Sequence, residues 1–177
     1  HIMVVENNNI EIKKFWDIDV NSVNLDMTEE EAIEGLDKHL NRAIDIRLRG
    51  DLTIGSFLSG GIDSSLITAL ASRKLKLEHP MESYTGCSEL VGEFDSQFAK
   101  QVCEEYPVNY NEVDIQMPEV ISSLLRSIWV LDEPLADSAT ISSYLVAKRG
   151  KEDVGVLLSG LGADELFAGL GRNVRGS

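Results

Sequence analysis

The sequence contains few of the residues that build disulfide frameworks or metal clusters. Among its 177 residues are only two cysteines, three histidines and four prolines, and aromatic residues make up 6%. Cys87 and Cys103 lack the paired spacing of zinc sites and redox dithiols, and the histidines show no ligand spacing. Reduced thiols are the ordinary state in the cytosol. We therefore expect a cytoplasmic protein with two free thiols.

Long apolar runs and basic residues are also scarce. No apolar run is long enough to cross a membrane, and no secretory signal opens the chain. The 16 Lys and Arg residues face 30 Asp and Glu residues, for a net charge of −14. A charge of this sign opposes contact with the phosphate backbone of nucleic acids. We therefore expect neither a membrane nor a nucleic acid as a partner.

The remaining composition is that of a globular protein with one main domain. Hydrophobic residues make up 43% of the chain, and this length suits one domain with a full core. We interpret residues 1–27 as an N-terminal arm or linker, with His1-Ile2-Met3 typical of a cloning scar. The body, residues 28–177, begins with Thr28 as N-cap and Glu31 at N3 of a capping box, on a helix that Gly50 ends.

Strands are predicted to alternate with helices along this body. The apolar patterns predict strands at residues 53–58, 82–85, 108–113 and 154–158. The helix after the first strand is expected to bury Leu66, Ile67 and Leu70, and the helix that Pro118 opens to bury Val120, Ile121, Leu124, Leu125 and Ile128. This alternation predicts an α/β fold with a doubly wound parallel sheet. Ligands of such sheets bind beyond the carboxyl ends of the strands, where the winding reverses.

The segment Leu58-Ser59-Gly60-Gly61-Ile62-Asp63-Ser64-Ser65 joins the first strand of the body to a helix. Two glycines allow a close backbone approach, and a helix start offers unpaired N–H groups to an anion. Its three serines can donate to phosphate oxygens, whereas the carboxylate of Asp63 would repel them. Asp63 therefore predicts either a divalent cation between it and the phosphates or a helix N-cap. An ordinary strand-to-helix turn remains the alternative.

A second loop with a similar motif follows the last predicted strand: Leu157-Leu158-Ser159-Gly160-Leu161-Gly162-Ala163-Asp164. Each loop follows a strand, contains Leu-Ser-Gly and places an aspartate where a helix begins. If the two strands are neighbours, Asp63 and Asp164 face one crevice and can hold Mg²⁺ on a polyphosphate. A glycine turn with an aspartate cap is the alternative for the second loop.

These loops carry a resemblance to known families. Ser-Gly-Gly-Ile-Asp-Ser-Ser resembles the pyrophosphate loop of the ATP pyrophosphatase superfamily. Residues 159–169, the loop 132–138 and Phe15-Trp16 are similar to the synthetase domain of glutamine-hydrolysing asparagine synthetases, and the resemblance covers roughly residues 15–170. It implies an adenine nucleotide alpha hydrolase-like fold. It also implies a ligase that uses Mg²⁺ and ATP to adenylate a small carboxylate, aspartate in that family, before an amine captures the acyl group.

The resemblance also assigns residues, although it names no catalytic one. It gives ATP and pyrophosphate binding to Leu58, Ser59, Gly60, Gly61, Asp63, Ser64, Ser65, Thr85, Gly86, Ser159 and Gly160. It gives Mg²⁺ to Asp63 and Asp164. It places near the amino-acid substrate the loop residues Asp132, Glu133, Asp137 and Ser138, for which a solvated acidic loop is the alternative.

The sequence departs from that family in three ways. Leu161 stands where asparagine synthetases usually have Glu, a residue suited to proton transfer. No glutaminase domain precedes the arm, so ammonia or a separate glutaminase domain or subunit is the expected nitrogen source. The family's domain also continues beyond the position of Ser177, so the chain is interpreted as a C-terminally truncated domain.

Three hypotheses follow for the function. The first is an AMP-forming, asparagine synthetase-like amide ligase, possible as a homodimer. The second keeps the fold but changes the carboxylate, as in β-lactam-forming or other amide ligases. The third is a nucleotide-binding or interaction module without catalysis, which Leu161 favours and the intact first loop opposes.

Overall fold

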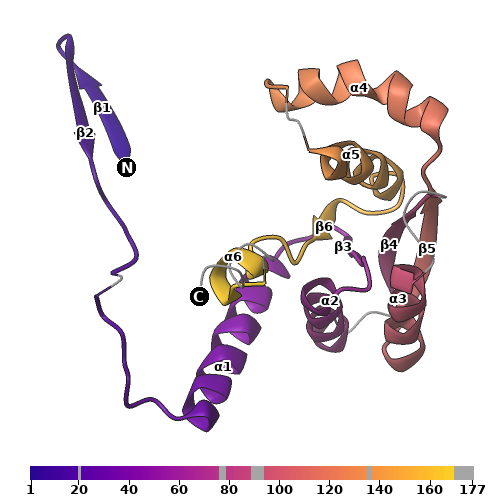
Figure 1. Ribbon diagram of the computed structural model, residues 1–177, viewed down its shortest axis with the longest axis horizontal. Coiled ribbons are helices and arrows are strands. Elements are labelled where there is room, and N and C mark those ends of the chain that lie inside the picture. The colour runs from indigo at the N-terminus through magenta and orange to yellow at the C-terminus, as the bar shows by residue number, and fades with distance from the viewer. Residues whose placement is uncertain (20, 76–78, 89–93, 135–136, 170–177) are drawn as a thin grey trace. The chain divides into compact units, whose positions relative to one another are not determined.

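The computed structural model describes residues 1–19, 21–75, 79–88, 94–134 and 137–169 (Figure 1). The chain forms two compact units, His1–His39 and Leu40–Ser177. Their boundary falls within α1 (Glu29–Arg47), and the division between residues 27 and 28 stays a prediction. Each unit is therefore described by itself.

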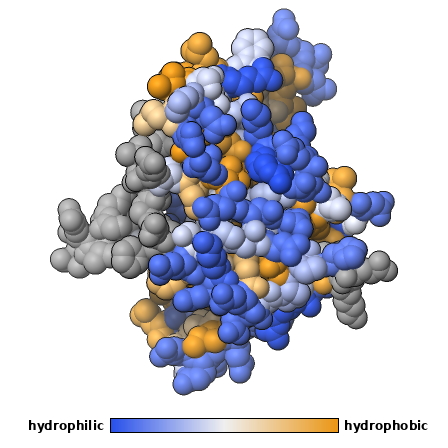
Figure 2. Space-filling model, turned by 90° about the vertical axis from the view of Figure 1, so that its right-hand side faces the viewer, coloured by the Kyte–Doolittle hydropathy of each residue, from blue (hydrophilic) through white to orange (hydrophobic). Residues whose placement is uncertain are grey.

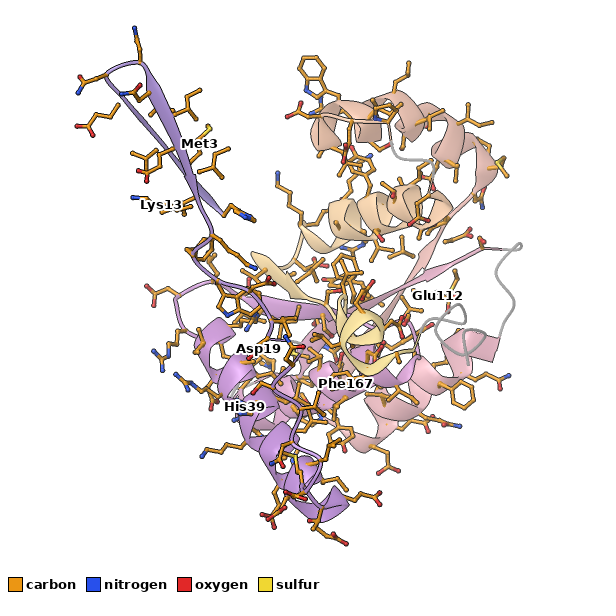
Figure 3. All side chains as sticks on the ribbon, turned by 60° about the vertical axis from the view of Figure 1, so that its left-hand side comes forward. Met3, Lys13, Asp19, His39, Glu112 and Phe167 are labelled. Atoms are coloured by element: carbon orange, nitrogen blue, oxygen red, sulfur yellow. The ribbon has the colours of Figure 1, made fainter. Side chains whose placement is uncertain are left out.

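The first unit begins with an antiparallel hairpin that the sequence patterns did not predict. Strands β1 (Ile2–Glu6) and β2 (Asn9–Lys13) pair around Asn7 and Asn8, whose φ angles are 48° and 62°. Asparagine tolerates this left-handed conformation, which tight hairpin turns require. The hairpin is exposed throughout, and the cross-strand partners Met3 and Ile12 are each 65% exposed. Figure 3 labels Met3 on β1 and Lys13 at the end of β2.

The predicted capping box at the start of α1 is confirmed. The backbone N–H of Thr28 donates to Oε2 of Glu31 at 3.0 Å, and the N–H of Glu31 donates to Oγ1 of Thr28 at 3.2 Å. Two of the helix's unpaired donors are thereby satisfied. The helix ends at Arg47, and Gly50 beyond it has a φ of 128°, which glycine adopts without strain.

The second unit contains a four-stranded sheet in which every neighbouring pair is parallel. Its strands are β3 (Ile54–Phe57), β4 (Met81–Cys87), β5 (Val108–Asp114) and β6 (Val156–Leu158), in the order β5-β4-β3-β6. The chain adds β4 and β5 on one side of β3 and then returns to place β6 on its other side. The winding therefore reverses between β3 and β6, and the predicted doubly wound sheet is confirmed.

Helices cover both faces of this sheet, with α2 (Ile62–Lys74) and α3 (Phe94–Glu105) on one and α4 (Met117–Leu131) and α5 (Ser138–Gly150) on the other (Figure 1). The core consists of two clusters of buried hydrophobic residues. One contains Ile44, Ile54, Ala71, Met81, Val108 and Leu158; the other contains Tyr84, Ile115, Leu145, Val146 and Val154. Burial on both faces is the arrangement expected of a parallel sheet.

Two expectations about the buried faces of helices are confirmed only in part. Helix α2 buries Ser64, Thr68, Ala71 and Ser72, while Leu66 is 42% exposed and Ile67 and Leu70 are only partly buried. On α4, Val120 packs against the core, but Ile121 is 67% and Leu125 80% exposed.

The face of the molecule in Figure 2 is mostly hydrophilic, with its apolar side chains in separate groups. Among the described helices, none has the length and apolar character of a membrane span.

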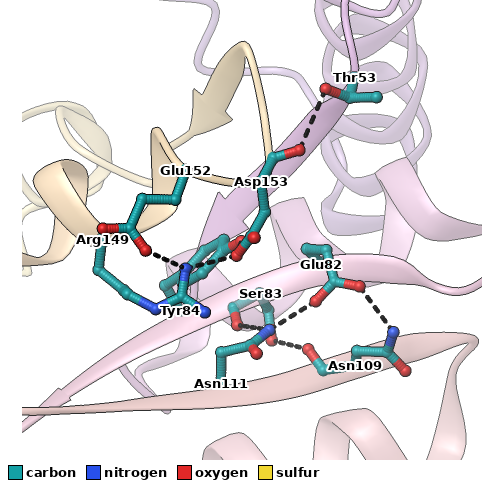
Figure 4. Close-up of polar contacts among 9 residues, drawn as sticks. All are labelled: Thr53, Glu82, Ser83, Tyr84, Asn109, Asn111, Arg149, Glu152 and Asp153. Carbon is teal, nitrogen blue, oxygen red and sulfur yellow. Dashed lines mark hydrogen bonds and ion pairs between the residues drawn. The ribbon is translucent and has the colours of Figure 1, made fainter.

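A polar network fastens the entry to β6 over the central strand β4 (Figure 4). The hydroxyl of the buried Tyr84 donates to Oδ2 of Asp153 at 2.8 Å, and Nη1 of Arg149 lies 2.6 Å from the same oxygen. Burial, and then the bond to Asp153, raises the pKa of Tyr84. The Tyr84 hydroxyl and Arg149 together hold the pKa of the Asp153 carboxyl below its usual range. The network therefore helps to place β6, and the loop that follows it, beside β3.

Candidate functional site

The first loop is closed by the hydroxyl groups of its own serines. The hydroxyls of Ser59 and Ser64 lie 3.0 Å apart, and the N–H of Ser59 donates to Oγ of Ser64 at 3.2 Å. The Ser64 hydroxyl donates to the carbonyl of Gly61 at 3.2 Å, while the N–H of Gly61 donates to Oγ of Ser59 at 3.3 Å. Gly60 has a φ of 89°, which explains a glycine at this turn. Both hydroxyl protons are thus used inside the loop.

The helix that follows has no side-chain cap. Its N-cap residue is Gly61, with φ −69° and ψ 160°, and Asp63 lies in the first turn. The N-cap alternative for Asp63 is therefore wrong. Because glycine has no side chain to bond the first amides of α2, these donors and the positive end of the helix dipole are suited to an anion. Asp63 is half-buried, as is Ser65, whereas Ser59 and Gly61 are exposed.

Hydrogen bonds from β4 hold the start of the first loop, where the chain leaves β3. Leu58 is fully buried; its N–H donates to the carbonyl of Tyr84 at 3.0 Å, and its carbonyl accepts from Oγ1 of Thr85 at 2.6 Å. Thr85 is 3% exposed. At Gly86, a Cβ atom would lie 2.9 Å from Cδ1 of Ile115 and 3.0 Å from Cγ2 of Val146. Thr85 and Gly86, the two residues of β4 that the resemblance assigns to ATP binding, are therefore packed tightly into the sheet.

The second loop turns sharply out of β6 into the short helix α6 (Ala163–Phe167). The N–H of Leu161 donates to Oγ of Ser159 at 3.1 Å, and Gly162 has a φ of 97° at the N-cap position. Ser159 and Asp164 are exposed, and Leu161 is 93% exposed. The loop therefore presents an apolar side chain at the position where proton-transferring glutamate is usual in the resembled family.

The two loops contact each other at the point where the sheet reverses its winding. Strands β3 and β6 are parallel neighbours, with Ser56 opposite Leu158, so their carboxyl ends lie side by side. A Cβ atom on Gly160 would lie 2.8 Å from the backbone carbon of Asp63 and 2.8 Å from the backbone nitrogen of Ser64. Only glycine allows this approach without displacement of backbone atoms. The condition set by the sequence, that the two strands are neighbours, is therefore met.

The predicted metal ligands stand on the two helices that follow these loops. Asp63 is half-buried on α2, and Asp164 is exposed on α6. Among the described residues, no group of three or more His, Cys, Asp or Glu side chains could hold a metal ion. A protein ligand set of two carboxylates suits Mg²⁺, which keeps waters and takes further oxygens from phosphates. The pairing of Asp63 with Asp164 on one ion stays a prediction.

The acidic loop between α4 and α5 has a local structural role. Asp132 ends α4 in the left-handed conformation, with a φ of 58°, and Oδ1 of Asp137 accepts the N–H of Ala139 at 2.9 Å as the N-cap of α5. Asp132, Glu133 and Asp137 are exposed. Ser138 is the first residue of α5, and its side chain lies outside the described part of the chain, as do residues 135 and 136. The role of this loop toward a substrate stays a prediction.

One pair of residues near the site did not stand out in the sequence. Oγ1 of Thr68 on α2 donates to Oγ of Ser56 on β3 at 2.9 Å, and both side chains are fully buried. This bond fixes α2 against the strand that precedes the first loop. The available signal was the spacing of Ser64, Thr68 and Ser72, which places small polar side chains on one face of the helix.

The chain matches the asparagine synthase family over residues 35–175. Asparagine synthetase (glutamine-hydrolysing) 1 of Bacillus subtilis is 36% identical over 142 residues, covering 80% of this chain and 22% of that protein. A putative glutamine-hydrolysing asparagine synthetase of Mycobacterium bovis is 38% identical over 123 residues, covering 69% of this chain and 18% of that protein. The chain thus spans about a fifth of the length of these relatives.

Among solved structures, the NH3-dependent NAD synthetase from Campylobacter jejuni is similar with a TM-score of 0.47 and 16% identity, covering 82% of this chain and 62% of that one. The family match extends from α1 through both loops and α6. The chain belongs to the asparagine synthase family.

Proposed function

We propose that this chain forms the nucleotide-binding core of an ATP-consuming ligase that makes an amide bond. The observation that carries the proposal is the contact of the two loops at Gly160, beyond the carboxyl ends of β3 and β6. This is where doubly wound sheets bind their ligands. Membership in the asparagine synthase family supports the same reading.

The phosphates of ATP are proposed to bind along the first loop. Ser59, Gly60, Gly61, Ser64 and Ser65 surround the uncapped start of α2, where backbone amides can donate to phosphate oxygens. Because the Ser59 and Ser64 hydroxyl protons are used within the loop, their donation to a phosphate requires these hydroxyls to rotate. The backbone amides are therefore expected to make the first contacts.

The adenosine part is proposed to lie between the ends of β4 and β6. Thr85 and Gly86 of β4, with Leu58 directly after β3, form one side of this region, and Ser159 and Gly160 after β6 form the other. Leu58 and Thr85 are buried, so they can shape the site but offer little surface. Ser159 and Gly160, which are exposed and half-buried, offer more of the contact area.

A divalent cation is proposed to sit between the carboxylates and the phosphates. Asp63 and Asp164 would hold Mg²⁺, which would supply positive charge to offset the charge that develops on the leaving pyrophosphate. Asp63 gains an additional favourable interaction from the start of α2, because the helix dipole stabilises a carboxylate there. Both carboxylates are therefore proposed as ligands of this ion.

The reaction proposed for the family-like enzyme has two steps. A carboxylate oxygen of the acceptor, aspartate in the simplest case, bonds to the α-phosphorus as the α–β anhydride bond breaks and pyrophosphate leaves. The lone pair of an amine, from ammonia or a glutaminase domain or subunit, then attacks the acyl carbon, and AMP leaves with the bonding pair. The attacking amine must lose a proton, and Leu161 cannot accept it. The acidic residues Asp132, Glu133 and Asp137 of the α4–α5 loop, and Ser138 at the start of α5, remain candidates for the acceptor side.

A second candidate function follows from Leu161. Its 93% exposure shows that it fills no core position, so packing does not explain a leucine there. This observation favours a nucleotide-binding module without amide synthesis. Another carboxylate acceptor in place of aspartate remains compatible with the same site.

Exchange of labelled pyrophosphate into ATP, with Mg²⁺ and a panel of carboxylic acids, separates these functions. Exchange that depends on one carboxylate identifies the acceptor and supports the ligase. ATP binding without exchange, for any acid, supports the nucleotide-binding module. Absence of ATP binding to the folded chain would contradict the proposed function.

A further inference from the structure

Two buried hydroxyl groups on the same face of β4 bond to the backbone of the neighbouring strands. Ser83 is 0% exposed and donates to the carbonyl of Asn109 on β5 at 2.8 Å (Figure 4). Thr85 is 3% exposed and donates to the carbonyl of Leu58 at 2.6 Å. The two bonds are chemically alike, but only the second one reaches the first loop.

The Leu58 carbonyl lies where the pairing of β3 with β4 stops. The last paired residues are Phe57 and Tyr84, and the N–H of Leu58 still donates to the carbonyl of Tyr84 at 3.0 Å. Beyond this point the chain turns away from β4 into Ser59. A buried carbonyl group needs a donor, and Thr85 supplies one from its side chain.

The same peptide group is held from its other side by the first turn of α2. The N–H of Ser59 belongs to the peptide that carries the Leu58 carbonyl, and it donates to Oγ of Ser64 at 3.2 Å. Because a peptide group is planar, its carbonyl and N–H cannot turn independently. A single peptide therefore links Thr85 on β4 to Ser64 on α2.

We propose that Thr85 is a positioning residue for phosphate binding, which acts through the Leu58–Ser59 peptide. This inference rests on the proposed function. The Thr85 hydroxyl sets the plane of that peptide, the peptide holds Ser64, and Ser64 holds the Ser59 hydroxyl and the Gly61 carbonyl. Thr85 is only 3% exposed and offers little surface for direct contact with a ligand, so its effect passes through this chain of bonds.

The test compares three variants of the whole chain. Thr85→Val keeps the shape of the side chain but removes the hydroxyl, and Thr85→Ser keeps the hydroxyl. Ser83→Ala is the matched control, because it removes a buried hydroxyl on the same face of the same strand whose bond leads to β5. Thr85→Ala is a second variant without the hydroxyl, so the comparison does not depend on how valine packs.

Two measurements are made on each folded variant. Calorimetric titration with Mg²⁺ and ATP should show affinity about tenfold weaker for Thr85→Val. Thr85→Ser and Ser83→Ala should stay within about twofold of the original chain. NMR spectra without nucleotide should show shifted amide signals of Ser59 and Gly61 in Thr85→Val but not in Ser83→Ala.

The outcomes separate this inference from the proposed function. If the original chain binds no ATP, the proposed function fails, while the Ser59 and Gly61 signals still decide whether Thr85 positions the loop. Unchanged signals in both Thr85→Val and Thr85→Ala would overturn the inference. Equal loss of affinity in Thr85→Val and Ser83→Ala would also overturn it, because it would reduce Thr85 to a general role in stability.

Discussion

Replacing Gly160 by alanine tests the contact between the two loops most directly. The added Cβ atom would lie 2.8 Å from two backbone atoms, the Asp63 carbon and the Ser64 nitrogen, and 2.9 Å from the Asp63 Cβ. Ordinary van der Waals contact begins near 3.4 Å, so the loops must separate by about 0.6 Å. None of the three atoms is the end of a flexible side chain, so the backbone has to move.

The cost follows from this displacement. Overpacking of this kind typically destabilises a protein by about 1–3 kcal/mol, which lowers the Tm of a chain of this length by about 2–12 °C. The same displacement moves the start of α2, so the affinity for Mg²⁺ and ATP should fall by at least about tenfold. Thermal unfolding and calorimetric titration measure the two effects.

The matched control is Gly35→Ala. Gly35 lies within α1, and a Cβ atom there has no neighbour within 4 Å. Alanine favours the helix, so this variant should gain about 0.4–1 kcal/mol of stability and keep its nucleotide affinity. If Gly160→Ala unfolds at the original temperature and binds ATP equally well, the two loops do not form one site.

Three further outcomes are expected. Asp63→Ala should weaken the binding of ATP with Mg²⁺ more than that of ATP without metal, because a carboxylate in a phosphate site needs a cation beside it; equal losses by calorimetry would refute the metal role. Thr28→Ala should cost about 1 kcal/mol in urea unfolding and leave nucleotide affinity unchanged, so a large affinity loss at unchanged stability would contradict the capping role. In the folded chain the pKa of Asp153 lies below its ordinary value of 3.8, so the ionised carboxylate stabilises the fold above pH 3.8, and this stability is lost as the pH falls through the folded pKa. Asp153→Asn removes this carboxylate, so Tm should rise less steeply with pH in the acid range. If Tm depends equally on pH below about pH 5 in the original chain and in Asp153→Asn, the bonds of Asp153 to Tyr84 and Arg149 do not stabilise the fold.

Much of the second unit could be predicted from the sequence because its signals are local. A buried strand needs a short apolar run, and a helix start needs a cap or a glycine turn, so β3, β6 and the loops after them were visible as patterns. The shared crevice inferred from the repeated Leu-Ser-Gly motif required the two strands to be neighbours. The register of β3 with β6 confirms it.

Exposure was harder to predict than periodicity. The pattern of α4 correctly groups residues that share a face, yet Ile121 and Leu125 on it are 67% and 80% exposed. Periodicity tells which side chains lie together but not whether another element covers them. The hairpin of β1 and β2 was missed for a related reason: its strands are exposed on both faces, so no burial pattern marks them.

Helix α2 shows why an apolar pattern can indicate the wrong face. Its buried face carries Ser64, Thr68 and Ser72, because the side chains there must be small enough for the helix to lie close to the sheet. Their hydroxyls bond to Ser59, Ser56 and the carbonyl of Ala69, which satisfies groups that burial would otherwise leave unpaired. Larger apolar residues on this face would hold α2 farther from β3 and move its first turn away from Gly160. The small polar face of α2 and the missing side chain of Gly160 therefore have the same effect, because both allow the two loops to contact each other.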